Sequence, residues 1–439
     1  MVSEAPMKKV YTCFCTSFIH KGHLNIIARA RELGEVTVGV LSDAAMIRYD
    51  RFPSCSFEER LAAARSIEGV ARVIVQNDMM YDSVIADLHP DFVIHGDNWC
   101  NPESPLHVIR QNVEACLAPY GGHIVDVPYT VAPDVKRIDE LDIERLAMPE
   151  FRRRRLRQLL EICPLVKALE AHSGLTGLIA EKTVARQADG RLDQFDAMWV
   201  SSLCDSTARG KPDIELVDMS SRLRTIDDIM EVTTKPIILD GGTGGLPEHF
   251  IYNVRTLERI GVSAVIIEDK CGPKQNSIFE TDIAQTQVFT ENFCAKIASG
   301  KNALRTRDFM IIARCESLAL ERGMDDALFR CRAYVAAGAD GIMIQSLQKD
   351  SDEIFMFCDR FRSTDSKTPI VVAPISLPTV TEAELAAHGV NICLYSNQLT
   401  RAAFPAMQSV ALDLLRHHRT LEVDARLIPF PQIIRLIDS

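Results

Sequence analysis

The chain has 439 residues, of which 47% are hydrophobic and 25% are charged, a composition typical of globular proteins with large cores. Its formal net charge of −11 argues against general nucleic-acid binding, which requires a positive surface. The first residues lack the apolar core of a signal peptide, and no apolar run approaches a membrane span of about 20 residues. Thirteen cysteines without zinc-ligand spacing indicate free thiols. We therefore expect a cytoplasmic protein that does not contact membranes.

Residues 1–134 alternate short apolar runs with helical patterns. The apolar runs predict strands at 9–14, 35–41, 71–75 and 92–95, and the helical patterns predict helices at 24–33 and 57–66. This alternation is typical of a small doubly wound parallel sheet. We therefore expect an α/β domain of Rossmann-like architecture in the first 134 residues.

One motif in this domain carries chemistry. His20, Gly22 and His23 follow the first predicted strand and precede a helix, so two imidazoles and backbone N–H groups would lie beside a bound anion. The motif resembles the HxGH signature of the cytidylyltransferase-like nucleotidyltransferases, and Arg60 and Asp97 match later positions of that family. The resemblance implies CTP as a substrate. It also implies that these five residues bind the nucleotide and that the histidines stabilise charge as pyrophosphate leaves.

Two departures leave the activity of this domain open. The acidic residue that usually precedes the motif is missing from Phe14-Cys15-Thr16-Ser17, and the Ser/Thr cluster that holds phosphates is replaced by residues 130–135. Transfer of CMP from CTP to a phosphonate and a domain kept for structure or assembly are both compatible with this pattern.

Residues 135–157 form a charged linker, and the run Arg152-Arg153-Arg154-Arg155-Leu156-Arg157 begins a predicted helix that continues to residue 162. Such a run can bind nucleic acid, but it is more often the solvated face of a helix that is paired with nearby acids. We predict the solvated face.

Residues 158–439 contain eight apolar runs separated by helical patterns. Eight strands of this kind over about 240 residues predict a (β/α)8 barrel of the TIM type. The predicted strands are 165–170, 195–202, 236–240, 264–269, 310–316, 341–346, 370–374 and 391–396.

Polar residues gather where these strands end. The chemistry of such barrels collects at the carboxyl ends of the strands, so we expect these side chains to meet there. Acids that converge from separate strands can hold Mg²⁺ together with several waters. The apolar run 264–267 of the fourth strand is directly followed by the polar stretch Glu268-Asp269-Lys270-Cys271-Gly272-Pro273-Lys274-Gln275-Asn276-Ser277.

The pattern EDK-x-G-x-x-x-NS in this stretch resembles the signature of the phosphoenolpyruvate mutases within the isocitrate lyase superfamily. The resemblance extends over about residues 160–438. It implies a Mg²⁺-dependent rearrangement of phosphoenolpyruvate to phosphonopyruvate, with Asp240 and Glu268 at the metal. Implied catalytic residues are Asp213, Lys274, Asn276, Arg314 and Gln345, and implied substrate-binding residues are Ser201, Ser202, Leu203, Lys270 and Ser277.

Two departures from that family keep three interpretations open. Gly242 replaces the usual second acid after the third strand, and Gln345 replaces the usual histidine after the sixth. The leading hypothesis is a fused phosphonate-biosynthesis enzyme that acts on small phosphorylated or phosphonate substrates. The alternatives are a lyase or hydrolase that acts on a phosphonate or a 2-oxo acid, and a catalytically retired assembly partner. The resemblance also implies a homo-oligomer, either a dimer or a tetramer.

Overall fold

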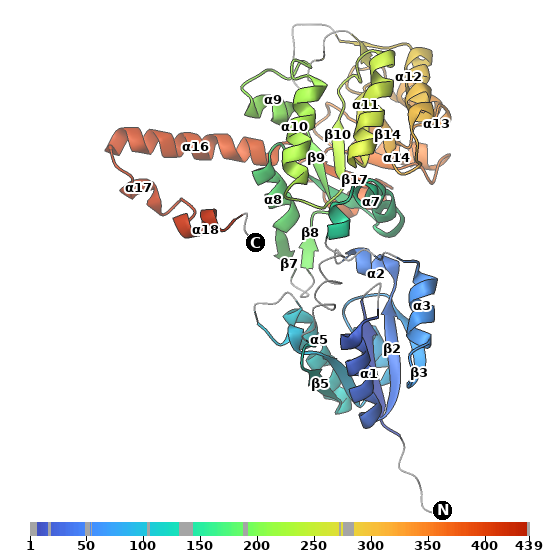
Figure 1. Cartoon of the computed structure of the whole chain (residues 1–439). Helices are drawn as coiled ribbons and strands as arrows, with labels where there is room; N and C mark the ends of the chain where they lie inside the picture. The colour runs from blue at the N-terminus through green and yellow to red at the C-terminus, as the bar shows by residue number, and fades with distance from the viewer. Residues whose placement is uncertain are drawn as a thin grey trace, which may run out of the picture. The chain divides into compact units, whose positions relative to one another are not determined.

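The computed structural model describes residues 7–15, 19–48, 53, 55–102, 106–130, 144–187, 192–271, 274 and 285–436. The chain divides into two compact units, Met1–Leu146 and Ala147–Ser439 (Figure 1). Among the described helices, none combines the length and the apolar character that crossing a membrane requires.

The first unit is built on a five-stranded parallel sheet in the order β3-β2-β1-β4-β5, which confirms the predicted Rossmann-like fold. Its strands are β1 Lys9–Phe14, β2 Glu35–Leu41, β3 Val70–Gln76, β4 Phe92–Gly96 and β5 His123–Val127. Its helices are α1 Lys21–Leu33, α2 Asp43–Arg48, α3 Phe57–Arg65, α4 Asp82–Leu88 and α5 His107–Leu117, with short 3₁₀ turns at Asp97–Trp99 and Ala118–Tyr120.

Both faces of this sheet are covered, as the alternation along β1 shows. Val10 and Phe14 pack with Ile27 of α1 in one buried cluster, whereas Tyr11 packs with Trp99 in another. Successive side chains of a strand point to opposite faces, so β1 contributes to two cores. Strand β5 is absent from the sequence prediction because its half-exposed residues give only a weak apolar signal.

The second unit is a closed parallel barrel with the strand order β10-β11-β14-β15-β16-β17-β6-β9 (Figure 1). This confirms the predicted TIM-type barrel, and each of its eight strands overlaps a predicted one. The strands are β6 Val166–Glu170, β9 Ala197–Val200, β10 Ile237–Asp240, β11 Ala264–Glu268, β14 Met310–Cys315, β15 Gly341–Ile344, β16 Ile370–Val372 and β17 Ile392–Tyr395.

Helices surround the barrel, and two short strand pairs lie outside its sheet. The helices are α7 Pro149–Ile162, α8 Gly174–Lys182, α9 Ser202–Ala208, α10 Met219–Met230, α11 Pro247–Ile260, α12 Thr290–Ala303, α13 Met324–Ala336, α14 Asp352–Arg362 and α15 Glu382–Ala387. The strand pairs are β7 Val184–Arg186 with β8 Leu192–Gln194, and β12 Lys270–Cys271 with β13 Thr286–Gln287.

The prediction that the arginine run of α7 is a solvated face is wrong. Arg152 and Arg155 are only 1% and 2% exposed. The Arg152 guanidinium donates hydrogen bonds to the Thr233 carbonyl and hydroxyl, and that of Arg153 donates to the Glu258 carbonyl at 2.9 Å. Arginine side chains are long enough to bring charge to backbone carbonyls at the ends of other elements. These arginines therefore fasten α7 to the barrel.

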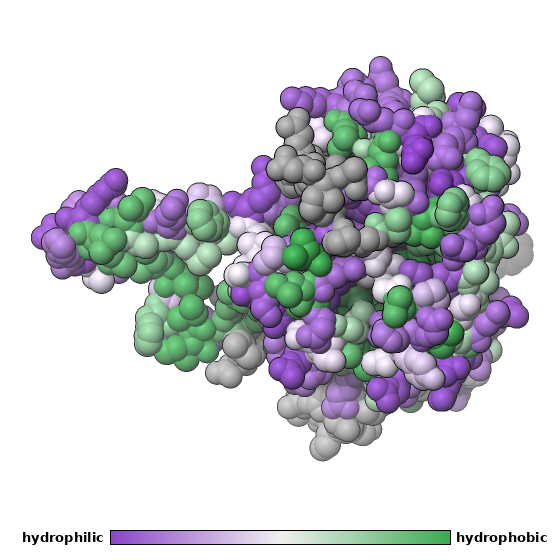
Figure 2. Space-filling view, turned by 90° about the horizontal axis from the view of Figure 1, so that it is seen from above, coloured by the Kyte–Doolittle hydropathy of each residue, from purple (hydrophilic) through white to green (hydrophobic). Residues whose placement is uncertain are grey.

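The chain leaves the barrel after β17 in a long helix, α16 Gln398–His417, followed by α17 Leu421–Asp424 and α18 Phe430–Ile434 (Figure 1). No residue of α16 is buried. The helix start is tied to the barrel because the Glu170 carboxylate accepts hydrogen bonds from the Thr400 N–H at 2.6 Å and its hydroxyl at 2.7 Å. The remainder projects as an arm with apolar side chains on its surface (Figure 2).

Candidate functional site

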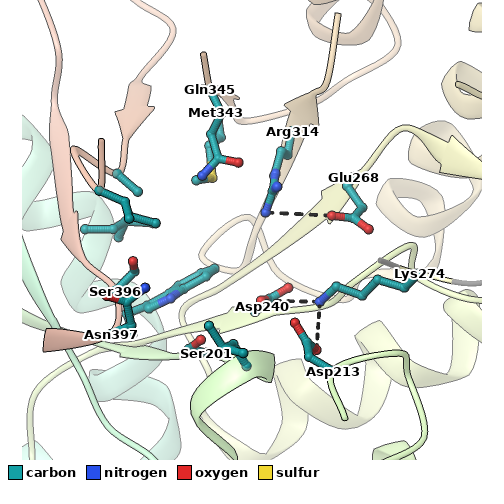
Figure 3. A pocket seen from close by; sticks show the side chains of 15 residues that line it. Ser201, Asp213, Asp240, Glu268, Lys274, Arg314, Met343, Gln345, Ser396 and Asn397 are labelled. Atoms are coloured by element: carbon teal, nitrogen blue, oxygen red, sulfur yellow. Dashed lines mark ion pairs between the residues drawn. The ribbon is translucent and has the colours of Figure 1, made fainter. Parts of the chain in front are cut away.

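A pocket lies where the barrel strands end (Figure 3). Strand alternation explains which residues reach it. Val265 and Ile267 of β11 pack in the layer between strands and helices, so Glu268 falls on the opposite, interior side of the strand. Eight of the predicted site residues line this one pocket: Ser201, Leu203, Asp213, Asp240, Glu268, Lys274, Arg314 and Gln345.

Asp240, the last residue of β10, is held in a defined orientation. One carboxylate oxygen accepts from the Ser202 N–H at 3.2 Å and the Ser202 hydroxyl at 2.7 Å. The other oxygen accepts from the Gly242 N–H at 3.0 Å. Burial alone would raise the pKa of Asp240, but the positive charges of Lys274 and Arg222 outweigh burial and hold the pKa below its ordinary value. Asp240 is therefore ionised at neutral pH.

Lys274 brings a buried cation to the acids (Figure 3). Its Nζ lies 3.3 Å from Asp213 Oδ1 and 3.7 Å from Asp240 Oδ2, and it donates a hydrogen bond to the Ser202 hydroxyl. Burial alone would lower the pKa of this ammonium, but the neighbouring carboxylates outweigh burial and raise it. The lysine thus carries a permanent charge inside the pocket.

A second cation lies on β14. Arg314 Nη1 is 3.7 Å from Glu268 Oε2, and its Nε donates a hydrogen bond to Glu316. Burial raises the pKa of Glu268, and the surrounding cations offset this effect only in part. Lys270 is buried with its Nζ 3.4 Å from Glu268 Oε1, and it supports this acid from outside the pocket lining.

The acids suit a hard divalent cation. Asp213 Oδ1 and Glu268 Oε1 are buried and accept no hydrogen bond from the residues that the structure describes, so their lysine ion pairs at 3.3 and 3.4 Å leave them able to bind a cation. Both face the same pocket as Asp240, and carboxylate oxygens are the ligands that Mg²⁺ prefers. The set Asp213, Asp240 and Glu268 therefore fits such an ion, whereas Asn276 and Ser277 lie outside the described residues.

The opposite wall of the pocket is largely apolar, and Met343, Ala373, Ile375 and Leu394 in it were not predicted as part of the site. It comprises Trp199, Met343, Ala373, Ile375 and Leu394, with Ser396 and Asn397 at its edge. These residues sit at the ends of β9, β15, β16 and β17, where apolar side chains are equally typical of the barrel core, so the sequence did not mark them as pocket lining. Arg222 was also missed, although its guanidinium donates to the carbonyls of Asp240 and Val200 and ties together the ends of β10 and β9.

The histidine motif of the first unit forms the start of α1. His20 is the N-cap: its Nδ1 accepts from the Gly22 N–H at 3.1 Å, and His23 Nδ1 accepts from the His20 N–H at 3.4 Å. A Cβ at Gly22 would lie 2.9 Å from the His20 ring, so the glycine is needed for this close approach. Burial and the neighbouring His20 and His95 lower the pKa of His23 to about 3. His23 is therefore neutral at pH 7 and can act there as a hydrogen-bonding group.

The other two predicted nucleotide-binding residues are engaged within the first unit. Arg60 is 3% exposed, and its guanidinium donates to the Leu41 carbonyl at 2.7 Å and to Asp43. These contacts favour a structural role for Arg60. Asp97 accepts a hydrogen bond from the Tyr129 N–H at 2.9 Å, which joins the ends of β4 and β5.

Comparison with known proteins agrees with this geometry. The family model described as phosphoenolpyruvate phosphomutase matches residues 156–415. The chain belongs to the phosphoenolpyruvate phosphomutase family. A second model, described as cytidylyltransferase-like, matches residues 14–136.

Relatives within this family differ in activity. The phosphonopyruvate hydrolase of Variovorax sp. is 36% identical over 283 residues, which cover 64% of this chain and 93% of the relative. The phosphoenolpyruvate phosphomutase of Streptomyces hygroscopicus is 33% identical over 65% of this chain and 87% of the relative. The crystal structure of the phosphoenolpyruvate phosphomutase of Streptomyces platensis subsp. rosaceus superposes with a TM-score of 0.59 at 31% identity, covering 64% of this chain and 93% of that one.

Proposed function

We propose that the barrel interconverts phosphoenolpyruvate and phosphonopyruvate in a Mg²⁺-dependent phosphoryl transfer. The observation that carries the proposal is the placement of two cations, the buried Lys274 and the partly buried Arg314, beside three acids in one pocket at the strand ends. Transfer of a phosphoryl group through a loose transition state requires positioning and charge stabilisation more than a nucleophile. A pocket of this composition suits that requirement.

Each part of the pocket has a task in this proposal. Asp213, Asp240 and Glu268 would hold Mg²⁺, directly or through waters, and the ion supplies neutralisation of substrate charge when it is bound. Lys274, Arg314 and Gln345 contact the phosphoryl oxygens. Ser201 and Leu203 line the pocket at the start of α9, where the Ser202 N–H already donates to Asp240 and the Cys204 N–H to the Ser201 hydroxyl. The Leu203 N–H is therefore the first-turn donor that suits the substrate carboxylate. Support for Mg²⁺ comes from a solved phosphonopyruvate hydrolase, 35% identical to this chain, whose complex contains oxalate and Mg²⁺.

Phosphorus NMR of the full chain with phosphonopyruvate and Mg²⁺ tests the proposal. We expect the phosphonopyruvate signal to be replaced by that of phosphoenolpyruvate. An unchanged spectrum at high enzyme concentration would contradict the assignment.

The same spectrum tests hydrolysis of phosphonopyruvate, the second candidate. The similarity to the Variovorax hydrolase favours it, as does Gln345, which can hydrogen-bond a phosphoryl oxygen but carries no charge. Inorganic phosphate in place of phosphoenolpyruvate would assign the hydrolase.

We further propose that the first unit transfers CMP from CTP to a phosphonate at the N-terminus of α1. The N-terminus of a helix suits a phosphate, and His20 and His23 lie there. Pyrophosphate release from CTP with a hydroxyalkylphosphonate acceptor tests this, with His23→Ala expected to abolish it and His123→Ala, at the exposed start of β5, expected to leave it unchanged. If the unsubstituted chain releases no pyrophosphate, the proposal is wrong.

We also propose that the chain forms homo-oligomers through α16. The arm exposes Phe404, Met407 and Leu415 at 66%, 65% and 71% of their surface. A row of large apolar side chains on a projecting helix is typical of a surface that another protein molecule covers.

A further inference from the structure

An acid outside the pocket lining contacts the turn that follows β10. Glu215 lies between α9 and α10 in a left-handed conformation with φ of +59°, which is costly for a residue other than glycine. Its carboxylate accepts hydrogen bonds from the Thr243 N–H at 2.6 Å and the Thr243 hydroxyl at 2.8 Å. These bonds hold an exposed acid in an unfavourable backbone conformation.

The same carboxylate fills the space beside Gly242. A Cβ at that position would lie 2.3 Å from Glu215 Oε1, so a side chain there would have to displace the Glu215 carboxylate from the turn. Gly242 itself has φ of +58°, in the left-handed region. Residue 242 therefore cannot carry a side chain while Glu215 occupies its place.

This turn orients Asp240. The Gly242 N–H donates to Asp240 Oδ1, and from the other side Lys296 Nζ donates to the carbonyls of Thr243 at 2.9 Å and Gly245 at 2.7 Å. The turn is thus clamped between an acid that binds its N–H and hydroxyl groups and a lysine that binds its carbonyls.

We propose that Glu215 is a positioning residue for the Asp240 end of the site and supplies the carboxylate that Gly242 lacks. Glu215 is not among the described residues that line the pocket, so it acts through the turn and through its negative charge. The inference rests on the proposed Mg²⁺ site. If the inference holds, an acidic side chain fits at position 215 or at position 242, but not at both.

Calorimetric titration of the full chain with MgCl₂ tests the pair. We expect Glu215→Ala to weaken Mg²⁺ affinity about tenfold, as loss of a group that orients a metal ligand does. Gly242→Asp should also weaken it, because the new side chain collides with Glu215 and is strained at a positive φ, and Glu215→Ala combined with Gly242→Asp should bind Mg²⁺ more tightly than Gly242→Asp alone. Glu231→Ala, which removes an exposed acid at the opposite end of α10, is the matched control and should bind normally.

Two results would overturn the inference. One is Glu215→Ala with unchanged Mg²⁺ affinity, and the other is a double variant no better than Gly242→Asp alone. If the unsubstituted chain binds no Mg²⁺, the proposed function fails, and thermal unfolding of the same variants then decides the Glu215 inference. In that case the double variant must unfold at a higher temperature than Gly242→Asp, because removal of Glu215 relieves the collision.

Discussion

Lys274 places a positive charge among the carboxylates of the site. Its Nζ lies within 4 Å of both Asp213 and Asp240, and burial strengthens these interactions because little water screens them. A cation held in place before the substrate arrives requires no reorganisation when charge moves during phosphoryl transfer. The proposed Mg²⁺ would share the Asp213 and Asp240 carboxylates with Lys274.

Replacing Lys274 by methionine separates these two effects. We expect turnover of phosphonopyruvate to fall by about 10²–10³, the usual effect of removing one preorganised electrostatic contact. Mg²⁺ affinity should remain equal or rise, because one competing cation is gone. Phosphorus NMR and calorimetry measure the two quantities, and Lys211→Met, at an exposed lysine between α9 and α10, is the control. Turnover within about threefold of the unsubstituted chain would place the phosphoryl contact elsewhere.

Sequence reasoning found the charged half of the site but not its apolar half. Asp240 and Arg314 were predictable because each is one of the last two residues of an apolar strand and lies on its interior side. Met343 and Ile375 could not be recognised in this way, since apolar residues at strand ends are equally typical of the barrel core. Glu215 could not be recognised either, because its importance depends on a contact with Gly242 that lies 27 positions away.

At the scale of elements, α7 shows that a run of arginines on a helix can be buried against a barrel as well as exposed to solvent. An arginine run is typical of a solvated helix, and local sequence contains nothing that distinguishes the buried case. Burial and loss of hydration lower the pKa of Arg152 to about 10, yet it stays protonated at neutral pH. What decides the outcome is the set of free carbonyls at Thr233 and Met230, which only the folded barrel provides.

Arg152→Ala should therefore destabilise the barrel. Removal of the guanidinium leaves buried carbonyls without donors, and we expect a loss of about 3 kcal/mol in the free energy of unfolding. The chain has two tryptophans, so a Trp99→Phe background leaves Trp199 as a fluorescent reporter of the barrel alone during urea unfolding. Arg224→Ala, at an exposed arginine of α10, should change stability by less than about 0.5 kcal/mol. Equal effects of the two substitutions would show that α7 is not fastened as described.

At the scale of the molecule, the exposed apolar side chains of α16 lead us to expect self-association. Phe404→Glu combined with Met407→Glu places two charges on its apolar surface, and we expect light scattering after gel filtration to show a smaller assembly. Gln408→Glu adds one charge at a nearby exposed polar position and serves as the control. A monomeric unsubstituted chain, or an unchanged mass for the double variant, would contradict assembly through α16.

The pairing of β17 with β6 closes the barrel, and the two strands lie more than 200 positions apart in the chain. Such a distant pairing makes closure a late event in folding, since the entropy of a long loop must be overcome first. During synthesis, the five-stranded sheet of the first unit is complete long before residue 392 has been made. Glu170 ends β6 and also holds Thr400, so the arm acquires its anchor only when the ring is closed. The association through α16 that we propose would therefore follow the closure of each barrel.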